Sequence, residues 1–117
     1  MTDPRDLNPI FSERFNAGDA GPIADLYEKD AVFHTSTGPI TGREAIRDHY
    51  ATMLASSPTM DSRARRILSC GDDLALITSD WTFTVGSDSR SGVSVEVVRR
   101  QPDGTWMYVI DEPDIQR

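Results

Sequence analysis

The sequence predicts an α+β fold in which helices gather on one side of a sheet. In the first half of the chain, apolar residues recur at the three- and four-residue intervals of helices. From residue 62 to residue 111 strand-like segments replace this periodicity, and Pro-Asp-Gly at 102–104 indicates a hairpin turn between the last two. A length of 117 residues suits one domain with a genuine core, so we expect a single domain over residues 1–117.

Two helices are expected at the start of the chain. The first has an apolar stripe formed by Leu7, Ile10, Phe11 and Phe15. It ends at Gly18, because glycine readily takes the left-handed conformation that terminates helices. Asp19 then caps a short second helix, and residues 30–34 follow as a short strand. The apolar stripe of the second helix consists of Ile23, Leu26 and Tyr27.

A third helix is predicted to start at Thr41. Thr41 and Glu44 match the T-x-x-E capping box, in which the two side chains bond each other's backbone amides. The apolar face of this helix consists of Ile46, Tyr50, Met53 and Leu54. We expect His49 to be a solvated position on it, and Pro58 to prevent its continuation.

Four strands are expected in the second half. They span residues 62–70, 74–85, 92–101 and 105–111. One face of the second strand consists of Ala75, Ile77, Ser79, Trp81, Phe83 and Val85. In the last two strands both faces are partly apolar, and such a sheet needs covering on both sides. Helices cover one side, and we expect a second copy of the protein to cover the other, giving a homodimer through the outer sheet face.

Two acids lie in the predicted hairpin, one in each strand. If Asp103-Gly104 forms a two-residue loop, Glu96 lies directly opposite Asp111. The same loop pairs Arg100 with Met107 and Val98 with Val109. Opposed like charges are unfavourable, so something must compensate for them. A three-residue loop would shift the pairing by one residue and place the two acids on opposite faces.

Charge and residue content exclude several function classes. A net charge of −7 argues against nucleic-acid binding, which draws on clustered Lys and Arg. The single cysteine, Cys70, excludes an internal disulfide and a cysteine-rich zinc site. No local spacing of ligands supports a metal site, so we expect neither a metal nor a cofactor. No leader and no membrane span is recognisable, so a cytoplasmic protein without membrane contact is expected.

Three segments carry a family resemblance: "FNAGDAGPIADLYEKDAVFHTSTGPITGREAIRDHY", "GDDLALITSDWTF" and "EVVRRQPDGTWMYVIDEP". Together they resemble the nuclear transport factor 2-like superfamily, in particular its small SnoaL-like and ketosteroid-isomerase-like bacterial members, over about residues 7–113. The resemblance implies a cone in which a curved, mixed, mainly antiparallel sheet packs on three helices around a pocket, usually in a homodimer. It does not imply one reaction, because members include isomerases, cyclases, dehydratases and proteins with no known catalysis.

Of the three functional residues of steroid isomerases, this sequence retains one in chemical type. Thr35 stands where these enzymes carry a general-base aspartate, and it has no basicity near neutral pH. Phe11 stands in place of a tyrosine that donates a hydrogen bond, which phenylalanine cannot do. Glu96 falls at the position of the second, protonated acid. We therefore do not expect steroid-like isomerisation through the same residues.

Glu96, Asp111 and His34 are the candidate catalytic residues. If both acids face an apolar pocket, burial and mutual repulsion raise at least one pKa, and the pair can supply an acid and a base. Alternatively, one acid reaches water or is neutralised by an arginine. Related cyclases and dehydratases pair a histidine with a carboxylate, but strict alternation places His34 on the face opposite Phe33 and Thr35, which favours a core or interface role.

The expected pocket lining consists of Phe11, Phe15, Tyr27, Thr35, Tyr50, Met53, Trp81, Phe83, Val98, Met107 and Val109. Plain core packing is the alternative role for these aromatic side chains. Two functions are compatible with this site. The first is cofactor-independent proton transfer, such as isomerisation, cyclisation or dehydration, on a small hydrophobic carbonyl or hydroxyl compound. The second is a non-catalytic ligand-binding or dimeric accessory module.

Overall fold

The computed structural model describes residues 3–115. After a 3-10 turn at Pro4–Asp6, the helices are α1 (Leu7–Asn16), α2 (Ala20–Ala24) and α3 (Arg43–Leu54). The strands are β1 (Tyr27–Thr35), β2 (Gly38–Thr41), β3 (Thr59–Cys70), β4 (Leu74–Val85), β5 (Asp88–Arg100) and β6 (Trp106–Glu112). The predicted α+β class is confirmed.

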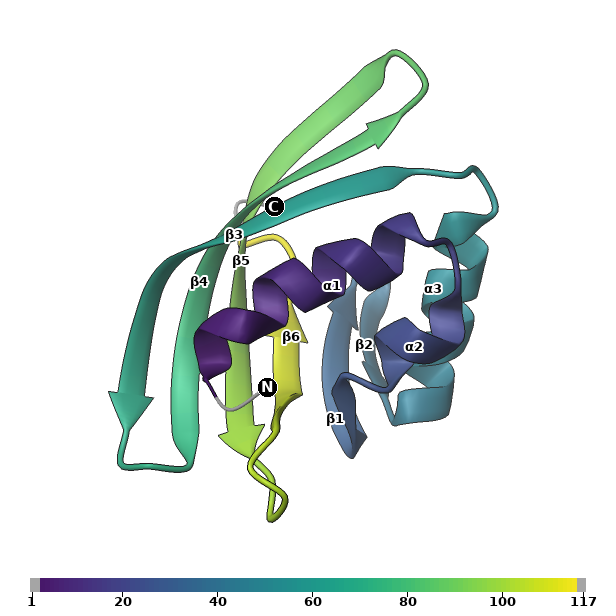
Figure 1. The fold of residues 1–117 in the computed structure, drawn as a ribbon. Helices are drawn as coiled ribbons and strands as arrows, with labels where there is room; N and C mark the ends of the chain where they lie inside the picture. The colour runs from purple at the N-terminus through teal and green to yellow at the C-terminus, as the bar shows by residue number, and fades with distance from the viewer. Residues whose placement is uncertain (1–2, 116–117) are drawn as a thin grey trace.

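The strands form one curved, mixed sheet in the order β2-β1-β6-β5-β4-β3. Only the β1–β6 pair is parallel among the described strands, and the other neighbours are antiparallel. In Figure 1 the long strands curve around α1, while α2 and α3 lie beside β1 and β2. The sheet therefore has a concave face that the helices cover and an outer face that they leave open.

The core lies between α1, α2, α3 and the concave face of the sheet. Its largest fully buried side chains are Tyr27, Phe15, Leu7, Ile23, Leu26, Ile46, Ile77 and Val98. The stripe predicted for the first helix supplies two of these, and the alternation predicted for residues 74–85 supplies Ile77. Packing of these faces against one another is the main stabilising contribution to the fold.

Two predictions about the first half are wrong at the level of single elements. The second helix ends at Ala24, and Tyr27 already opens β1, because the backbone amide of Tyr108 bonds the carbonyl of Leu26 and draws this segment into the sheet. The capping box also does not form. Thr41 belongs to β2, and Gly42 is the N-cap of α3 with φ at 101°, a conformation that glycine adopts without strain.

The β5–β6 hairpin confirms the pairing of Glu96 with Asp111 but by a different route. The loop has three residues, since the amide of Gln101 bonds the carbonyl of Thr105 across Pro102, Asp103 and Gly104. The predicted partners are therefore wrong near the turn: Arg100 pairs with Trp106, and Val98 pairs with Tyr108. Between these pairs and the next, Val97 with Ile110, β6 contains one extra residue, Val109. This β-bulge restores the pairing of the two acids.

Gly92 and Trp81 are cross-strand partners on β5 and β4. A Cβ atom at Gly92 would lie 2.3 Å from Cζ2 of the Trp81 indole. The indole has little freedom to move, because its Nε1 donates a hydrogen bond to the carbonyl of Pro113 at 2.6 Å. Glycine at this position is therefore a packing requirement rather than a turn requirement.

We predict that Gly92→Ala lowers the free energy of unfolding by about 1–3 kcal/mol, the usual range for an added methyl in a packed site. Urea unfolding followed by circular dichroism measures this value. Gly21→Ala is the matched control, because its Cβ would meet only Asp19 Oδ1 at an ordinary 3.6 Å. Equal stability of the Gly92→Ala variant and the wild type would contradict the packing argument.

Candidate functional site

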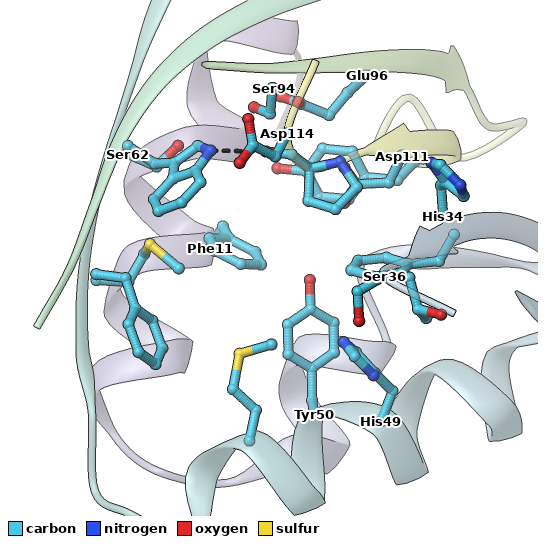
Figure 2. Close-up of a pocket in the computed structure, with 18 of the residues that line it drawn as sticks. Phe11, His34, Ser36, His49, Tyr50, Ser62, Ser94, Glu96, Asp111 and Asp114 are labelled. Atoms are coloured by element: carbon cyan, nitrogen blue, oxygen red, sulfur yellow. Dashed lines mark hydrogen bonds between the residues drawn. The ribbon is translucent and has the colours of Figure 1, made fainter. Parts of the chain in front are cut away.

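A cavity of about 390 Å³ lies between α1, α3 and the concave face of the sheet (Figure 2). Its apolar wall consists of Phe11, Phe33, Tyr50, Met53, Met60, Trp81, Phe83 and Tyr108. Its polar lining includes His34, Ser36, His49, Ser62, Arg90, Ser94, Glu96, Asp111 and Asp114. In Figure 2, Ser94, Glu96, Asp111 and Asp114 lie at the end opposite Tyr50 and His49. A mostly apolar cavity with a few convergent polar groups is the usual form of a small-molecule site.

Glu96 projects from β5 toward this cavity and is only 4% exposed. Its Oε1 accepts a hydrogen bond from the Ser79 hydroxyl at 2.9 Å. The Ser79 oxygen in turn accepts from Nδ2 of Asn8 at 2.9 Å, and the same nitrogen donates to Ser62 at 2.8 Å. The other oxygen of Glu96, Oε2, is buried and has no hydrogen-bond partner among residues 3–115.

Asp111 projects from β6 beside Glu96 and is 7% exposed. The Tyr27 hydroxyl donates to its Oδ2 at 2.5 Å. Tyr27 and Tyr50 share a second hydrogen bond of 2.7 Å between their hydroxyls. Since the proton of Tyr27 is used on Asp111, the proton of this second bond comes from Tyr50. A chain of three groups therefore connects Asp111 to a tyrosine of the cavity wall.

Burial changes the protonation of both acids. It raises the pKa of Glu96 to about 8, with the charge of Asp111 acting in the same direction and the nearby Ser94 hydroxyl and the hydrogen bond from Ser79 acting against both. Burial also raises the pKa of Asp111 to about 7, against the effect of the bond from Tyr27. Near neutral pH the pair therefore holds a proton, which resolves the repulsion expected between opposed carboxylates.

The tyrosines around the acids stay neutral. Burial, followed by the nearby acids, raises the pKa of Tyr27 and Tyr108 well above the usual value, and burial does the same for Tyr50. A neutral hydroxyl keeps its proton and can donate it in a hydrogen bond. This is why Tyr27 can stabilise the charged form of Asp111.

Two histidines lie at the cavity. His34 is half exposed, and its Nδ1 lies 2.7 Å from Oε2 of Glu112. His34 and Phe33 are neighbours near the end of β1. Side chains alternate along a strand, yet both residues line the cavity. His49 packs on the Phe33 ring with 4.9 Å between ring centres, and burial lowers its pKa. The prediction that His49 is merely solvated is therefore wrong.

The structure brings together all three candidate catalytic residues and part of the predicted lining. The predicted residues that do line the cavity are Phe11, Thr35, Tyr50, Met53, Trp81 and Phe83. Phe15, Tyr27 and Val98 instead belong to the fully buried core. Met107 and Val109 are also outside the lining, because the bulge leaves Tyr108 and Asp111 on the cavity side of β6.

Sequence reasoning missed several residues of the site. Tyr108 is absent from the expected lining, which contains Met107 and Val109 instead, and no local pattern signals the bulge that turns Tyr108 toward the cavity. His49 had a usable signal, since Ile46, His49, Tyr50 and Met53 follow the i, i+3, i+4, i+7 spacing of one helical face. Asn8 had none, because its partners are 54 and 71 residues away in the sequence.

Comparison with known proteins identifies the family. A model of the SnoaL-like domain matches residues 10–114, nearly the whole chain. The chain belongs to the SnoaL-like family. Among curated proteins, none matches this SnoaL-like chain.

Solved structures show the same nuclear transport factor 2-like fold. A Xanthomonas campestris protein, described as a calcium/calmodulin-dependent protein kinase II association domain, is similar at 22% identity with a TM-score of 0.81, covering 93% of this chain and 85% of its own. A nuclear transport factor 2-like protein of Shewanella oneidensis is similar at 17% identity with a TM-score of 0.81, covering 91% of this chain and 91% of its own. A ketosteroid isomerase-like protein of Erwinia carotovora is similar at 15% identity with a TM-score of 0.72, covering 88% of this chain and 85% of its own. At these identities the likeness concerns the fold alone.

Residues 3–115 of the SnoaL-like chain offer neither a metal-binding cluster nor a membrane-spanning helix. Among residues 3–115, no cluster of three or more His, Cys, Asp or Glu side chains is arranged to hold a metal ion. None of the described helices is long and apolar enough to cross a membrane.

We predict that the SnoaL-like chain loses stability as the pH rises from 5 to 8.5. Both acids have folded-state pKa values above those of the unfolded chain, so folding takes up protons in this range. Their contribution is fully present below the unfolded values near 4 and is lost as the pH rises through about 7 and 8. Urea unfolding at several pH values, with ¹³C titration of the carboxyl groups, measures both effects.

Glu96→Gln should flatten this pH dependence and stabilise the protein more at pH 8.5 than at pH 5. Glu28→Gln is the control of opposite sign. Burial would raise the pKa of Glu28, but hydrogen bonds from Arg99 and Gln101 outweigh it and lower the pKa. Removing this acid should therefore cost stability near neutral pH. A wild type that becomes more stable from pH 5 to pH 8.5 would rule out the buried, proton-sharing pair.

Proposed function

We propose that this SnoaL-like protein binds a small, mainly apolar molecule with one carbonyl or hydroxyl group and catalyses proton transfer at that group. The observation that carries the proposal is Oε2 of Glu96, a buried oxygen without a partner among residues 3–115, on a residue that lines an apolar cavity. A buried polar atom left unpaired is unfavourable. A ligand oxygen placed beside this atom would satisfy it.

The two acids take different roles in the proposed reaction. Asp111 is the base, because the hydrogen bond from Tyr27 favours its charged form. Neutral Glu96 is the acid that donates a hydrogen bond to the ligand oxygen. With a ketone, the C–H bond beside the carbonyl breaks and its proton passes to Asp111. The electron pair of that bond forms an enolate, whose oxygen Glu96 stabilises. Where the ketone also carries a double bond conjugated with the enolate, return of the proton to the far carbon of that double bond completes an isomerisation.

His34 is assigned to proton exchange with the solvent. Its neighbour Phe33 is the β1 partner of Asp111 in the parallel pair, so His34 lies close in the sheet to the proposed base. Its ring is half exposed and hydrogen-bonded to Glu112. A histidine at the rim can transfer protons between a buried site and water near neutral pH.

A non-catalytic binding function is the second candidate, and one observation favours it. The hydroxyl of Thr35, at the position of the isomerase base, donates to the carbonyl of Gly38 at 2.6 Å. It is thus used inside the protein. With Phe11 in place of the donating tyrosine, binding without turnover would follow if Asp111 does not act as a base.

We also propose that the SnoaL-like chain forms a homodimer through the outer face of the sheet. Directly paired apolar residues cross five strands on this face: Leu68, Leu76, Val97, Ile110 and Val32. Leu68 is 57% exposed and Ile110 is 47% exposed. Val32, Leu76 and Val97 are half-buried, and an apolar row that includes such exposed side chains is typical of an interface. Similar structures from Xanthomonas campestris and Thiobacillus denitrificans are described as association domains, which agrees with an assembly role.

We predict that the protein exchanges the hydrogens beside the carbonyl of a bound small ketone for deuterium in D₂O. NMR over a panel of cyclic ketones measures the exchange. Asp111→Asn should lower the rate by about 100-fold or more, the usual contribution of a general base. Asp72→Asn, an exposed substitution of the same kind, should leave the rate unchanged. Ketone binding without exchange in the wild type would favour the non-catalytic function instead.

We predict that Ile110→Lys converts the protein from dimer to monomer, because it places a charge in the apolar row. Sedimentation velocity at several concentrations measures the assembly state. Ala51→Lys, which adds the same charge on the exposed side of α3, should leave the dimer intact. A wild type that sediments as a monomer at all concentrations would exclude the dimer.

A further inference from the structure

Asn8 has an environment that packing alone does not explain. It lies in the first turn of α1, is 2% exposed, and is absent from the cavity lining. Its Nδ2 makes two hydrogen bonds, whereas its Oδ1 is buried without a partner among the described residues. An unpaired buried carbonyl costs stability, so an apolar residue of similar size would suit this position better for folding alone.

We propose that Asn8 acts through Ser79 to place the proton of neutral Glu96 on Oε2, so that the site selects ligands with an oxygen that accepts a hydrogen bond. Ketones, esters and similar carbonyl compounds belong to this class. The inference rests on the proposed binding function and adds to it a positioning residue and a ligand preference. Asn8 itself does not touch the ligand.

The argument follows the protons along the chain of contacts. The amide nitrogen of Asn8 carries two hydrogens, and both are used, one on Ser62 and one on Ser79. The Ser79 oxygen therefore acts as an acceptor toward Asn8. Its single proton remains for the other partner, Oε1 of Glu96, at 2.9 Å.

The consequence for Glu96 is an asymmetric carboxyl group. Because Oε1 accepts from Ser79, a proton on Oε1 would face the Ser79 proton, so the acidic proton lies on Oε2. Oε2 has no partner among residues 3–115 and belongs to a residue of the cavity lining. Neutral Glu96 therefore presents a donor in a fixed direction. Without Asn8, the Ser79 hydroxyl could turn and accept a proton from Oε1 instead.

The test compares two ligands of nearly equal size, indane and 1-indanone, which differ by one carbonyl oxygen. We expect the wild type at pH 6 to bind 1-indanone about tenfold more tightly than indane, as for one hydrogen bond to a buried group. Trp81 lines the cavity, so its fluorescence reports both affinities. The carbonyl stretch of bound 1-indanone should also move to lower frequency, because a hydrogen bond weakens the C=O bond.

Asn8→Leu should remove the preference and the shift in carbonyl stretch while indane binding is retained. Leu resembles Asn in size and eliminates the unpaired Oδ1, so the variant is expected to fold. If it does not fold, Ser79→Ala removes the same donor from Glu96 and should show the same two losses. Glu13→Leu, on the exposed side of α1, is the control and should behave as the wild type.

Three results would overturn the inference, and they separate it from the proposed function. If Asn8→Leu and Ser79→Ala both keep the preference and the spectral shift, neither residue determines which oxygen of Glu96 carries the proton. Only the inference then fails. If the wild type binds both ligands equally, the inference also fails while binding in an apolar cavity stands. If the wild type binds neither ligand, the proposed function fails together with the inference.

Discussion

The β-bulge at Val109 is the feature on which the candidate site depends. In a regular strand, Tyr108 and Asp111 would lie on opposite faces, because side chains alternate. The extra residue between the pairs Val98 with Tyr108 and Val97 with Ile110 places both on the concave side. The three-residue loop of the hairpin would otherwise separate Asp111 from Glu96. The bulge therefore determines the wall of the cavity and the pairing of its acids, and bulges are common beside functional sites.

Two buried carboxyl groups side by side require compensation, and the surroundings provide it in two ways. Proton sharing removes one charge, since burial raises the pKa of Glu96 and of Asp111. Hydrogen bonds from Tyr27 to Asp111 and from Ser79 to Glu96 then stabilise the remaining charge. Compensation is incomplete, because Oε2 of Glu96 has no hydrogen-bond partner in the part of the chain that the structure describes. Local departures from full satisfaction are expected where a protein binds another molecule.

Sequence patterns predicted the features that depend on near neighbours in the chain. The α+β class, the strand at residues 74–85 and the apolar stripe of α1 all follow from periodicity. The partner of Glu96 was also predicted, but through a two-residue loop that does not form. Val109 favours regular strands, so nothing local indicates its bulge, and the faces of Met107 and Tyr108 were exchanged as a result. The role of Asn8 depends on contacts more than 50 residues away, which no local pattern can indicate.

The SnoaL-like fold supplies a cavity but not a reaction, since one fold carries different chemistry in different proteins. In this chain the positions that would carry isomerase chemistry hold Phe11 and Thr35, and the hydroxyl of Thr35 bonds the backbone of its own hairpin. The carboxyl groups with raised pKa values lie instead on β5 and β6, with donors reaching them from β1, β4 and, through Ser79, from α1. A function for this protein therefore has to be sought in the Glu96–Asp111 pair. Asn8, whose carbonyl has no hydrogen-bond partner among the described residues, connects that pair to the first helix through Ser79.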